Sequence, residues 1–253
     1  MIARLVLALL AFATLTGAAG PKLVPDVSSR AIEIRYSFTG AELLLFGAVV
    51  YPGGRVPETP ADVLVVLKGP TEPILMREKQ KIAGIWMNAD SHRFRSVPGF
   101  YALASAKPVG ELVDERTAAI YELGLANLSL SPGAGSEPEK QQRFEAGLID
   151  LKTRLGLYSE QPGGVEVTDG VLYRATIAIP SRVPVGTYTA ETFLVADGRV
   201  LAAATRDIEI GKSGFERFVT LAAERQPLLY GLAAVLISLT LGWIAAAFFK
   251  KRV

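Results

Sequence analysis

The chain has 253 residues, half of them hydrophobic, and its 27 basic and 25 acidic residues give a formal net charge of only +2. This balance gives no indication of a basic face for nucleic acid. Cysteine is absent, which excludes disulfides, thiolate nucleophiles and thiolate metal sites. His92 is the single histidine, so histidine-based metal binding and acid–base catalysis are severely limited.

Residues 1–20 have the pattern of a secretory signal peptide. Arg4 supplies a positive start, residues 5–15 form an apolar run, and Gly17, Ala18 and Ala19 are small, as signal peptidase requires. We expect cleavage near residue 19 or 20, with an uncleaved signal anchor as the alternative. Both interpretations carry the residues that follow out of the cytoplasm.

Residues 21–211 are expected to form a mainly β periplasmic region, because short apolar or alternating runs are separated by turns rich in proline and glycine. An immunoglobulin-like antiparallel β-sandwich suits this pattern better than a parallel sheet. Asp197-Gly198, between two β-rich runs, is the strongest hairpin signal. One sandwich is favoured over two small ones, because neither half carries a full set of strands. The expected strands cover residues 31–38, 42–51, 62–67, 74–76, 84–87, 100–104, 171–179, 187–196 and 200–210.

A helical insertion is expected at about residues 110–158. Its first helix covers residues 111–123, and Ser136 with Glu139 forms a capping-box pattern ahead of a second helix. The periodicity of the second helix predicts an amphipathic helix on the sandwich, with a short coiled-coil seam as the alternative. The sequence leaves open whether this helix packs on its own sandwich or on another subunit. Its apolar stripe consists of Phe144, Leu148, Leu151 and Leu155.

Residues 227–249 are expected to form a transmembrane helix. No charge occurs from residue 228 to 249, and a helix of this length extends about 33 Å, enough for a hydrocarbon core of about 30 Å. Lys250, Lys251 and Arg252 would then stop transfer and remain on the cytoplasmic side. Together with the signal peptide, this pattern predicts a single-pass protein of the bacterial inner membrane. Its N-terminal domain would lie in the periplasm, and residues 250–253 would form a cytoplasmic tail.

Residues 212–226 are expected to form a juxtamembrane stem, either an amphipathic turn at the outer interface or a helix that continues into the span with a kink near Pro227. Within the span, small residues recur every four positions, and such a stripe lets another helix approach closely. This candidate helix-packing stripe consists of Ala234, Ser238, Gly242 and Ala246.

No motif marks a catalytic, cofactor or metal site. Gly211-Lys212-Ser213 resembles the end of a phosphate-binding loop, but Arg206 replaces the glycine that the motif requires five positions earlier. A serine triad would need His92 as its base, and no nucleophile-elbow pattern accompanies it.

The segment around His92 offers two weaker indications. Asn88, Asp90 and His92 would share one face of an extended chain, which makes at most a partial metal site, so His92 is interpreted as a solvated loop histidine. Arg93 and Arg95, on either side of a phenylalanine, are a slight indication of an anion site.

Two stretches resemble a known family. They are FTGAELLLFGAVV at residues 38–50 and GFERFVTLAAERQPLLYGLAAVLISLTLGWIAAAFF at residues 214–249. Together they are similar to a family of alphaproteobacterial transmembrane proteins with a signal peptide, a periplasmic region and one C-terminal span. The family has no assigned activity or catalytic residues, so the resemblance transfers none. It implies a sulfite-exporter-type permease as a partner, because members are often encoded near such transporters.

The sequence therefore predicts a membrane-anchored periplasmic accessory or interaction protein of an inner-membrane complex, without catalysis and without a cofactor. The alternative is a periplasmic module that binds a small anion. A hydrolase that uses unmarked carboxylates is a third possibility. The expected partners are the lipid bilayer and an integral membrane protein, and not nucleic acid.

Overall fold

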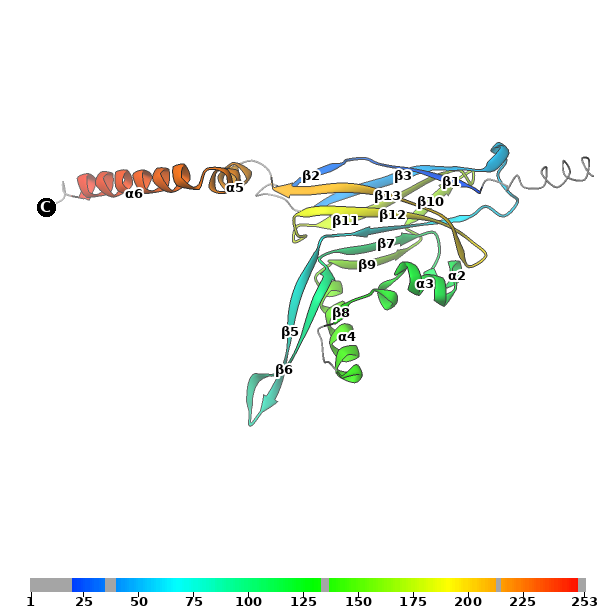
Figure 1. Ribbon diagram of the computed structural model, residues 1–253, viewed down its shortest axis with the longest axis horizontal. Helices are drawn as coiled ribbons and strands as arrows, with labels where there is room; N and C mark the ends of the chain where they lie inside the picture. The colour runs from blue at the N-terminus through cyan, green and yellow to red at the C-terminus, as the bar shows by residue number, and fades with distance from the viewer. Residues whose placement is uncertain (1–19, 35–39, 133–136, 213–214, 250–253) are drawn as a thin grey trace, which may run out of the picture. The chain divides into compact units, whose positions relative to one another are not determined.

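The structure, a computed structural model, describes residues 20–34, 40–132, 137–212 and 215–249 (Figure 1). The chain divides into two compact units, one with residues 1–32 and 39–210, and the other with residues 33–38 and 211–253. The expected signal peptide, apart from residue 20, and the stop-transfer cations Lys250, Lys251 and Arg252 lie outside the described residues.

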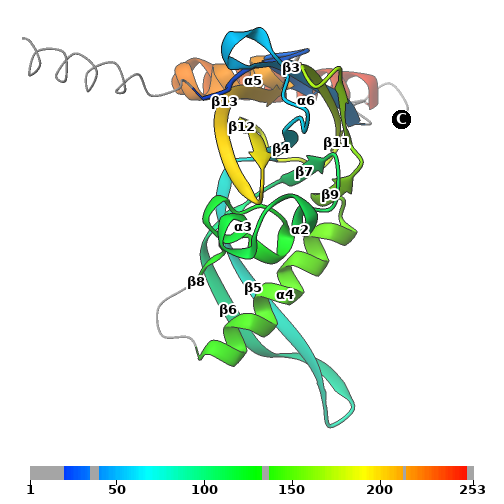
Figure 2. The ribbon, with the colours of Figure 1, turned by 90° about the vertical axis from the view of Figure 1, so that its right-hand side faces the viewer.

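Two sheets of the first unit form a sandwich, and together with the hairpin described below they make the fold mainly β, as expected (Figure 2). The smaller sheet has the order β1-β3-β11-β10, and the larger has the order β2-β13-β12-β4-β7-β9. The registers described within these sheets are antiparallel, except that β9 runs parallel to β7. The strands are β1 (Lys22–Val27), β2 (Ala31–Ile34), β3 (Gly40–Val50), β4 (Asp62–Lys68), β7 (Tyr101–Ser105), β9 (Tyr158–Pro162), β10 (Val165–Thr168), β11 (Leu172–Pro180), β12 (Gly186–Ala196) and β13 (Arg199–Lys212).

The core lies between these sheets. All five residues from Val63 to Leu67 in β4 are buried, as expected for a central strand that is covered on both faces. In β11, buried and exposed residues alternate, which is the pattern of a strand with one face in the core. The expected turn between β12 and β13 is confirmed, since Asp197 and Gly198 have φ values of 51° and 76°, as a two-residue hairpin turn requires.

Gly47 allows a close approach between β1, β3 and β11. A Cβ atom at this position would lie 2.4 Å from the backbone O of Val24 and 2.6 Å from the hydroxyl of Tyr173. Both distances are far below van der Waals contact, so the glycine inside the apolar run of β3 is required by packing.

A long hairpin leaves the larger sheet between β4 and β7. It consists of β5 (Thr71–Ile82) and β6 (Ile85–Pro98), and with β8 (Ser131–Pro132) it forms a third sheet. At its base, Gly69 N–H donates to Phe100 O and Gly99 N–H donates to Pro70 O, both at 2.8 Å. The sequence predicted only two short strands here, at 74–76 and 84–87, because most of the hairpin carries charged and exposed residues.

The first part of the helical insertion differs from the single helix expected over residues 111–123. Helix α2 (Val109–Leu112) ends at Val113, which is extended and bridges to Gly198, and helix α3 (Glu115–Tyr121) begins anew. Asp114 caps α3, because its carboxylate accepts a 2.6 Å hydrogen bond from Thr117 N–H. A short 3₁₀ turn, η2 (Leu125–Asn127), follows, and another, η1 (Pro52–Gly54), lies after β3.

Helix α4 (Pro138–Arg154) packs along the β5–β6 hairpin, and its C-terminal end lies beside β9 of the larger sheet (Figure 2). Its N-cap is Glu137, whose side chain makes no capping hydrogen bond, and Ser136 of the expected capping box lies outside the described residues. Only the first half of the expected apolar stripe is covered: Phe144 and Leu148 are buried, whereas Leu151 and Leu155 are 47% and 39% exposed.

The second unit contains helices α5 (Phe215–Arg225) and α6 (Pro227–Phe249). In α6, residues 227–246 form a segment that is long and apolar enough to cross a membrane, with a mean hydropathy of 2.0. All side chains of this segment are exposed, which suits a lipid surrounding. It is the one such helix in the part of the chain that the structure describes.

Candidate functional site

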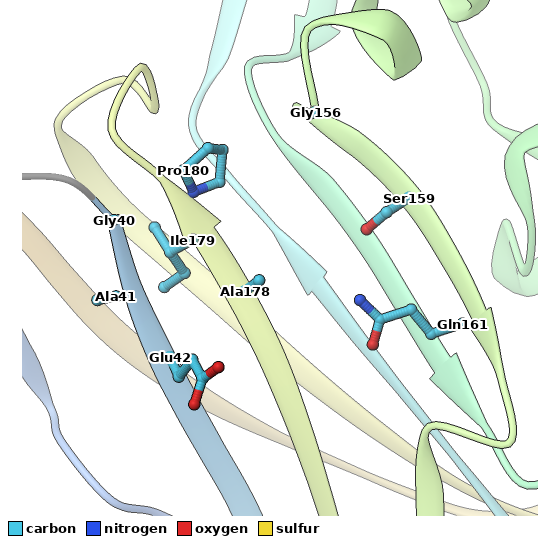
Figure 3. Close-up of a pocket in the computed structure, with 9 residues that line it drawn as sticks. All are labelled: Gly40, Ala41, Glu42, Gly156, Ser159, Gln161, Ala178, Ile179 and Pro180. Atoms are coloured by element: carbon cyan, nitrogen blue, oxygen red, sulfur yellow. The ribbon is translucent and has the colours of Figure 1, made fainter.

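A groove of about 410 Å³ lies where the two sheets of the sandwich part from each other at one side (Figure 3). Strand β11 borders it on one side and strand β9 on the other. Small residues and backbone make up much of the wall, and the polar side chains that line it are those of Glu42, Ser159 and Gln161. The complete lining is Gly40, Ala41, Glu42, Gly156, Ser159, Gln161, Ala178, Ile179 and Pro180.

The β11 side of the groove is an open strand edge. Ser28 N–H donates to Leu44 O at 2.9 Å. Because the backbone groups of successive residues point to opposite sides of a strand, the even-numbered residues of β3 direct their N–H and C=O groups to β1, and the odd-numbered residues direct theirs to β11. Since Thr176 pairs with Leu44, the backbone N–H and C=O groups of Thr176 and Ala178 point away from β3. Strand β10 reaches only Leu172–Ala175, and no strand of the described ranges covers the rest of this edge.

The β9 side is also a sheet edge, since no further strand of the described residues pairs with β9 there. Tyr101 N–H in β7 donates to Leu157 O at 3.0 Å. The odd-numbered residues of β9 therefore make the backbone hydrogen bonds to β7. The backbone groups of Tyr158 and Glu160 therefore point to the outer edge of the larger sheet, where β9 is the last strand.

This arrangement can bind an extended peptide. Unpaired N–H and C=O groups on a strand edge are a template for one more strand, and the small groove residues leave room for its side chains. The sequence did not predict β9, because Tyr158–Pro162 is short and mostly polar. The alternation of Ser159 and Gln161 on one side with Glu160 on the other, ahead of Pro162 and two glycines, was a weak signal for it.

A second groove, of about 310 Å³, lies beside the end of α3. At its base, Lys68 Nζ lies 3.1 Å from a carboxylate oxygen of Glu122 and 3.1 Å from one of Glu191. The walls include the rings of Tyr121 and Phe193, whose centroids are 5.5 Å apart. The cation already neutralises part of the acidic charge, so the cluster ties the end of α3 to β4 and β12. These residues are far apart in the sequence, and no local pattern indicates that they meet.

Tyr101 lies behind this cluster. Its hydroxyl donates to the backbone O of Glu122 and accepts from Gly124 N–H, both at 2.9 Å. Burial raises the pKa of Tyr101 above its usual value, and the carboxylates of Glu160, Glu122 and Glu191 raise it further. The hydroxyl is therefore neutral and serves as a structural hydrogen-bond group.

His92 is not a solvated loop residue, as the sequence suggested. It lies in β6, is 3% exposed, and packs between Phe94 at 4.6 Å and Phe144 at 5.6 Å between ring centroids. The expectation failed because the hairpin is longer than its apolar residues suggest, and α4 covers this part of it.

Asp90 and His92 do share one face of β6, but helix α4 occupies that face. The Asp90 carboxylate is paired with Lys140 and with Arg143, the latter at 2.9 Å. The hydrogen bond from Lys140 lowers the pKa of Asp90 below its usual value, and the bond from Ser91 N–H adds to this effect. Across residues 20–34, 40–132, 137–212 and 215–249, no group of three or more acidic or histidine side chains could hold a metal ion.

The remaining predicted residues lie apart from the grooves. Arg93 and Arg95 are on the exposed face of β6 and line neither of these two grooves. In the span, Ala234, Ser238, Gly242 and Ala246 are exposed, and Ser238 Oγ donates to Ala234 O at 2.8 Å. That bond satisfies the serine hydroxyl within its own helix.

Comparisons with known proteins give one family. A family model described as "Putative transmembrane protein (Alph_Pro_TM)" matches residues 22–251. No protein with a curated description matches the chain. Among solved structures, the crystal structure of Spo0M, a sporulation control protein from Bacillus subtilis, is 12% identical with a TM-score of 0.32. That match covers 82% of this chain and 56% of the Spo0M chain.

Proposed function

Because the chain belongs to this transmembrane protein family, we propose that it is a single-pass inner-membrane protein whose β domain acts in the periplasm as a non-enzymatic accessory subunit. The candidate span in α6 supports the anchor. The signal-peptide pattern of residues 1–20 and the cations Lys250, Lys251 and Arg252 support the orientation, with the C-terminal end in the cytoplasm.

The groove between β9 and β11, called the seam below, is the proposed interaction site. An extended segment of a partner adds to the free edge of β11 next to Thr176 and Ala178, and its side chains enter the groove between the sheets. The partner is an integral membrane protein, because the anchor keeps the domain beside the bilayer. A transporter such as a sulfite-exporter-type permease is the partner that the family resemblance implies.

A substitution of one edge residue tests this function. Ala178→Pro removes the outward N–H of β11 and is compatible with an edge strand, because that N–H makes no bond within the sheet. Ala178→Ser is the matched control, since it keeps the N–H and adds only one oxygen atom to the groove wall. We expect that purification from native membranes in mild detergent recovers a membrane partner with the wild type and with Ala178→Ser, but not with Ala178→Pro.

Two results would contradict the proposal. One is recovery of monomer alone from native membranes with the wild-type chain. The other is equal partner recovery with both variants, which would place the interaction elsewhere. Circular dichroism of each purified variant checks that the sheet content is unchanged.

A further inference from the structure

The tip of the β5–β6 hairpin, residues 79–89, exposes an unusual set of side chains. Every residue from 79 to 89 is exposed, including four large apolar ones. The exposed fractions are 48% for Ile82, 69% for Ile85, 67% for Trp86 and 49% for Met87. Exposed apolar groups gathered on one projecting element mark a contact surface, because single scattered ones would need no explanation.

The hairpin register sorts these residues onto two faces. Ile82 lies opposite Ile85 and Gln80 opposite Met87, so one face of the tip is mainly aliphatic. On the other face, Trp86 lies directly opposite Lys81. The tip is narrow, because Ala83 and Gly84 form a two-residue turn with φ values of 50° and 87°.

The tip also carries uncompensated positive charge. Lys79 and Lys81 lie in residues 79–89, and no acidic residue does. The nearest acidic residues along the hairpin are Glu78 and Asp90, and Arg143 of α4 lies 3.3 Å from the first and 2.9 Å from the second. Lys140 also pairs with Asp90. The helix thus neutralises the acids of the stem and leaves the cations of the tip free to meet an anionic surface.

We propose that this tip inserts into the surface of an anionic phospholipid bilayer. Tryptophan next to lysine, with aliphatic side chains on the other face, is the composition of elements that lie at a lipid interface. A protein interface would instead be depleted in lysine. The candidate span in α6 would anchor the same molecule in a bilayer. This second membrane contact is independent of the seam between β9 and β11.

Trp86 itself can report the contact. The chain has two tryptophans, so Trp243→Phe leaves Trp86 as the single emitter. We would reconstitute this full-length variant into vesicles of phosphatidylcholine with phosphatidylglycerol, with and without brominated acyl chains. We expect a blue-shifted emission, strong quenching by the brominated lipid, and loss of quenching by aqueous acrylamide. Trp86→Phe, which reports Trp243 in the span, is the positive control for lipid quenching.

Two further variants separate the apolar and charged contributions. Ile82→Ser with Ile85→Ser removes the aliphatic face. In this variant, acrylamide in the aqueous phase should again quench the emission of Trp86. Lys79→Gln with Lys81→Gln, or vesicles of phosphatidylcholine alone, should reduce the quenching by brominated lipid. Emission from Trp86 that acrylamide quenches freely and brominated lipid leaves unchanged would overturn the proposal. Equal lipid quenching in neutral and anionic vesicles would overturn the assignment to an anionic surface.

Discussion

The imidazole ring of His92 stacks on the phenyl ring of Phe144, with centroids 5.6 Å apart and ring planes inclined by 25°. This contact joins the middle of the β5–β6 hairpin to helix α4. Around it, Arg143 reaches both Glu78 and Asp90, and Lys152 Nζ lies 3.2 Å from Glu72. Both an aromatic contact and several ion pairs therefore hold the stem of the hairpin against helix α4.

We expect Phe144→Ala to lower the free energy of unfolding by about 3 kcal/mol, because a buried aromatic ring is lost and a cavity remains. Denaturant titration of the purified protein in detergent measures the change. Leu151→Ala on the same helix is the control. Its side chain is 47% exposed, so a change of no more than about 0.5 kcal/mol is expected. Equal losses in both variants would show that the stack does not hold the hairpin.

The ion pairs of the stem predict a dependence on pH. The pKa of Asp90 is lowered from its usual 3.8, so its contribution to stability is fully present above that value and is lost as the pH falls through the lower folded pKa. We expect hydrogen-exchange protection of β6, corrected for intrinsic exchange, to decrease in that acidic range. In Asp90→Asn, protection should be lower at neutral pH and should change less on acidification. An identical acid response in both proteins would exclude Asp90 as the group responsible.

Gly47 predicts a steric effect. Gly47→Ala places a methyl group 2.4 Å from the Val24 carbonyl oxygen, so β1 must shift. We expect a loss of about 2 kcal/mol, in the range of overpacked cores. At Gly211, a Cβ atom would meet nothing within 4 Å, so Gly211→Ala should leave the denaturation midpoint nearly unchanged. A neutral Gly47→Ala would mean that β1 does not approach β3 as closely as described.

The cluster around Lys68 predicts a non-additive pair of substitutions. Lys68→Met leaves the carboxylates of Glu122 and Glu191 without their shared cation, and we expect a loss of about 1 kcal/mol, because the groups are partly exposed. Adding Glu191→Gln should restore part of this loss, because it removes one of the two like charges. A double-mutant cycle from urea titrations measures the coupling. Strict additivity would show that the charges do not interact.

The proposed interaction role predicts an effect within the span. If a partner helix packs on the small-residue stripe, Gly242→Leu blocks its approach and reduces co-purification of that partner. Ala233→Leu is the matched control, since position 233 lies on the opposite side of the helix by its spacing from Ala234 and Ser238. Unchanged crosslinking in Gly242→Leu would remove the stripe from the proposal and leave the seam as the interaction site.

The strands of the sandwich could be predicted because their signals are local. Asp197-Gly198 selects a hairpin turn without help from the rest of the chain, and the run from Val63 to Leu67 is apolar enough to be a central strand. The break between α2 and α3 was missed for the opposite reason. The residues around Val113 continue a helical pattern, but a contact with Gly198, far along the chain, holds Val113 extended.

The candidate groove depends on contacts that sequence periodicity does not contain. Its β9 side forms only because Tyr158–Pro162 pairs in parallel with β7, more than fifty positions earlier. A five-residue polar strand has little signal of its own. The burial of His92 was likewise unpredictable. The residue that covers it, Phe144, belongs to helix α4, and tertiary packing determines where that helix lies on the hairpin.

The closed base of the β5–β6 hairpin has a consequence for variation and engineering. Strands β4 and β7, before and after it, are direct neighbours, and the bonds from Gly69 to Phe100 and from Gly99 to Pro70 complete their ladder. Residues inserted or deleted near the turn therefore do not change the register of the larger sheet. Beyond Glu78 and Asp90, where the ion pairs with α4 end, the tip can change in length without disturbing the larger sheet. A recognition sequence grafted there would therefore leave the sandwich intact while it removes the proposed bilayer contact.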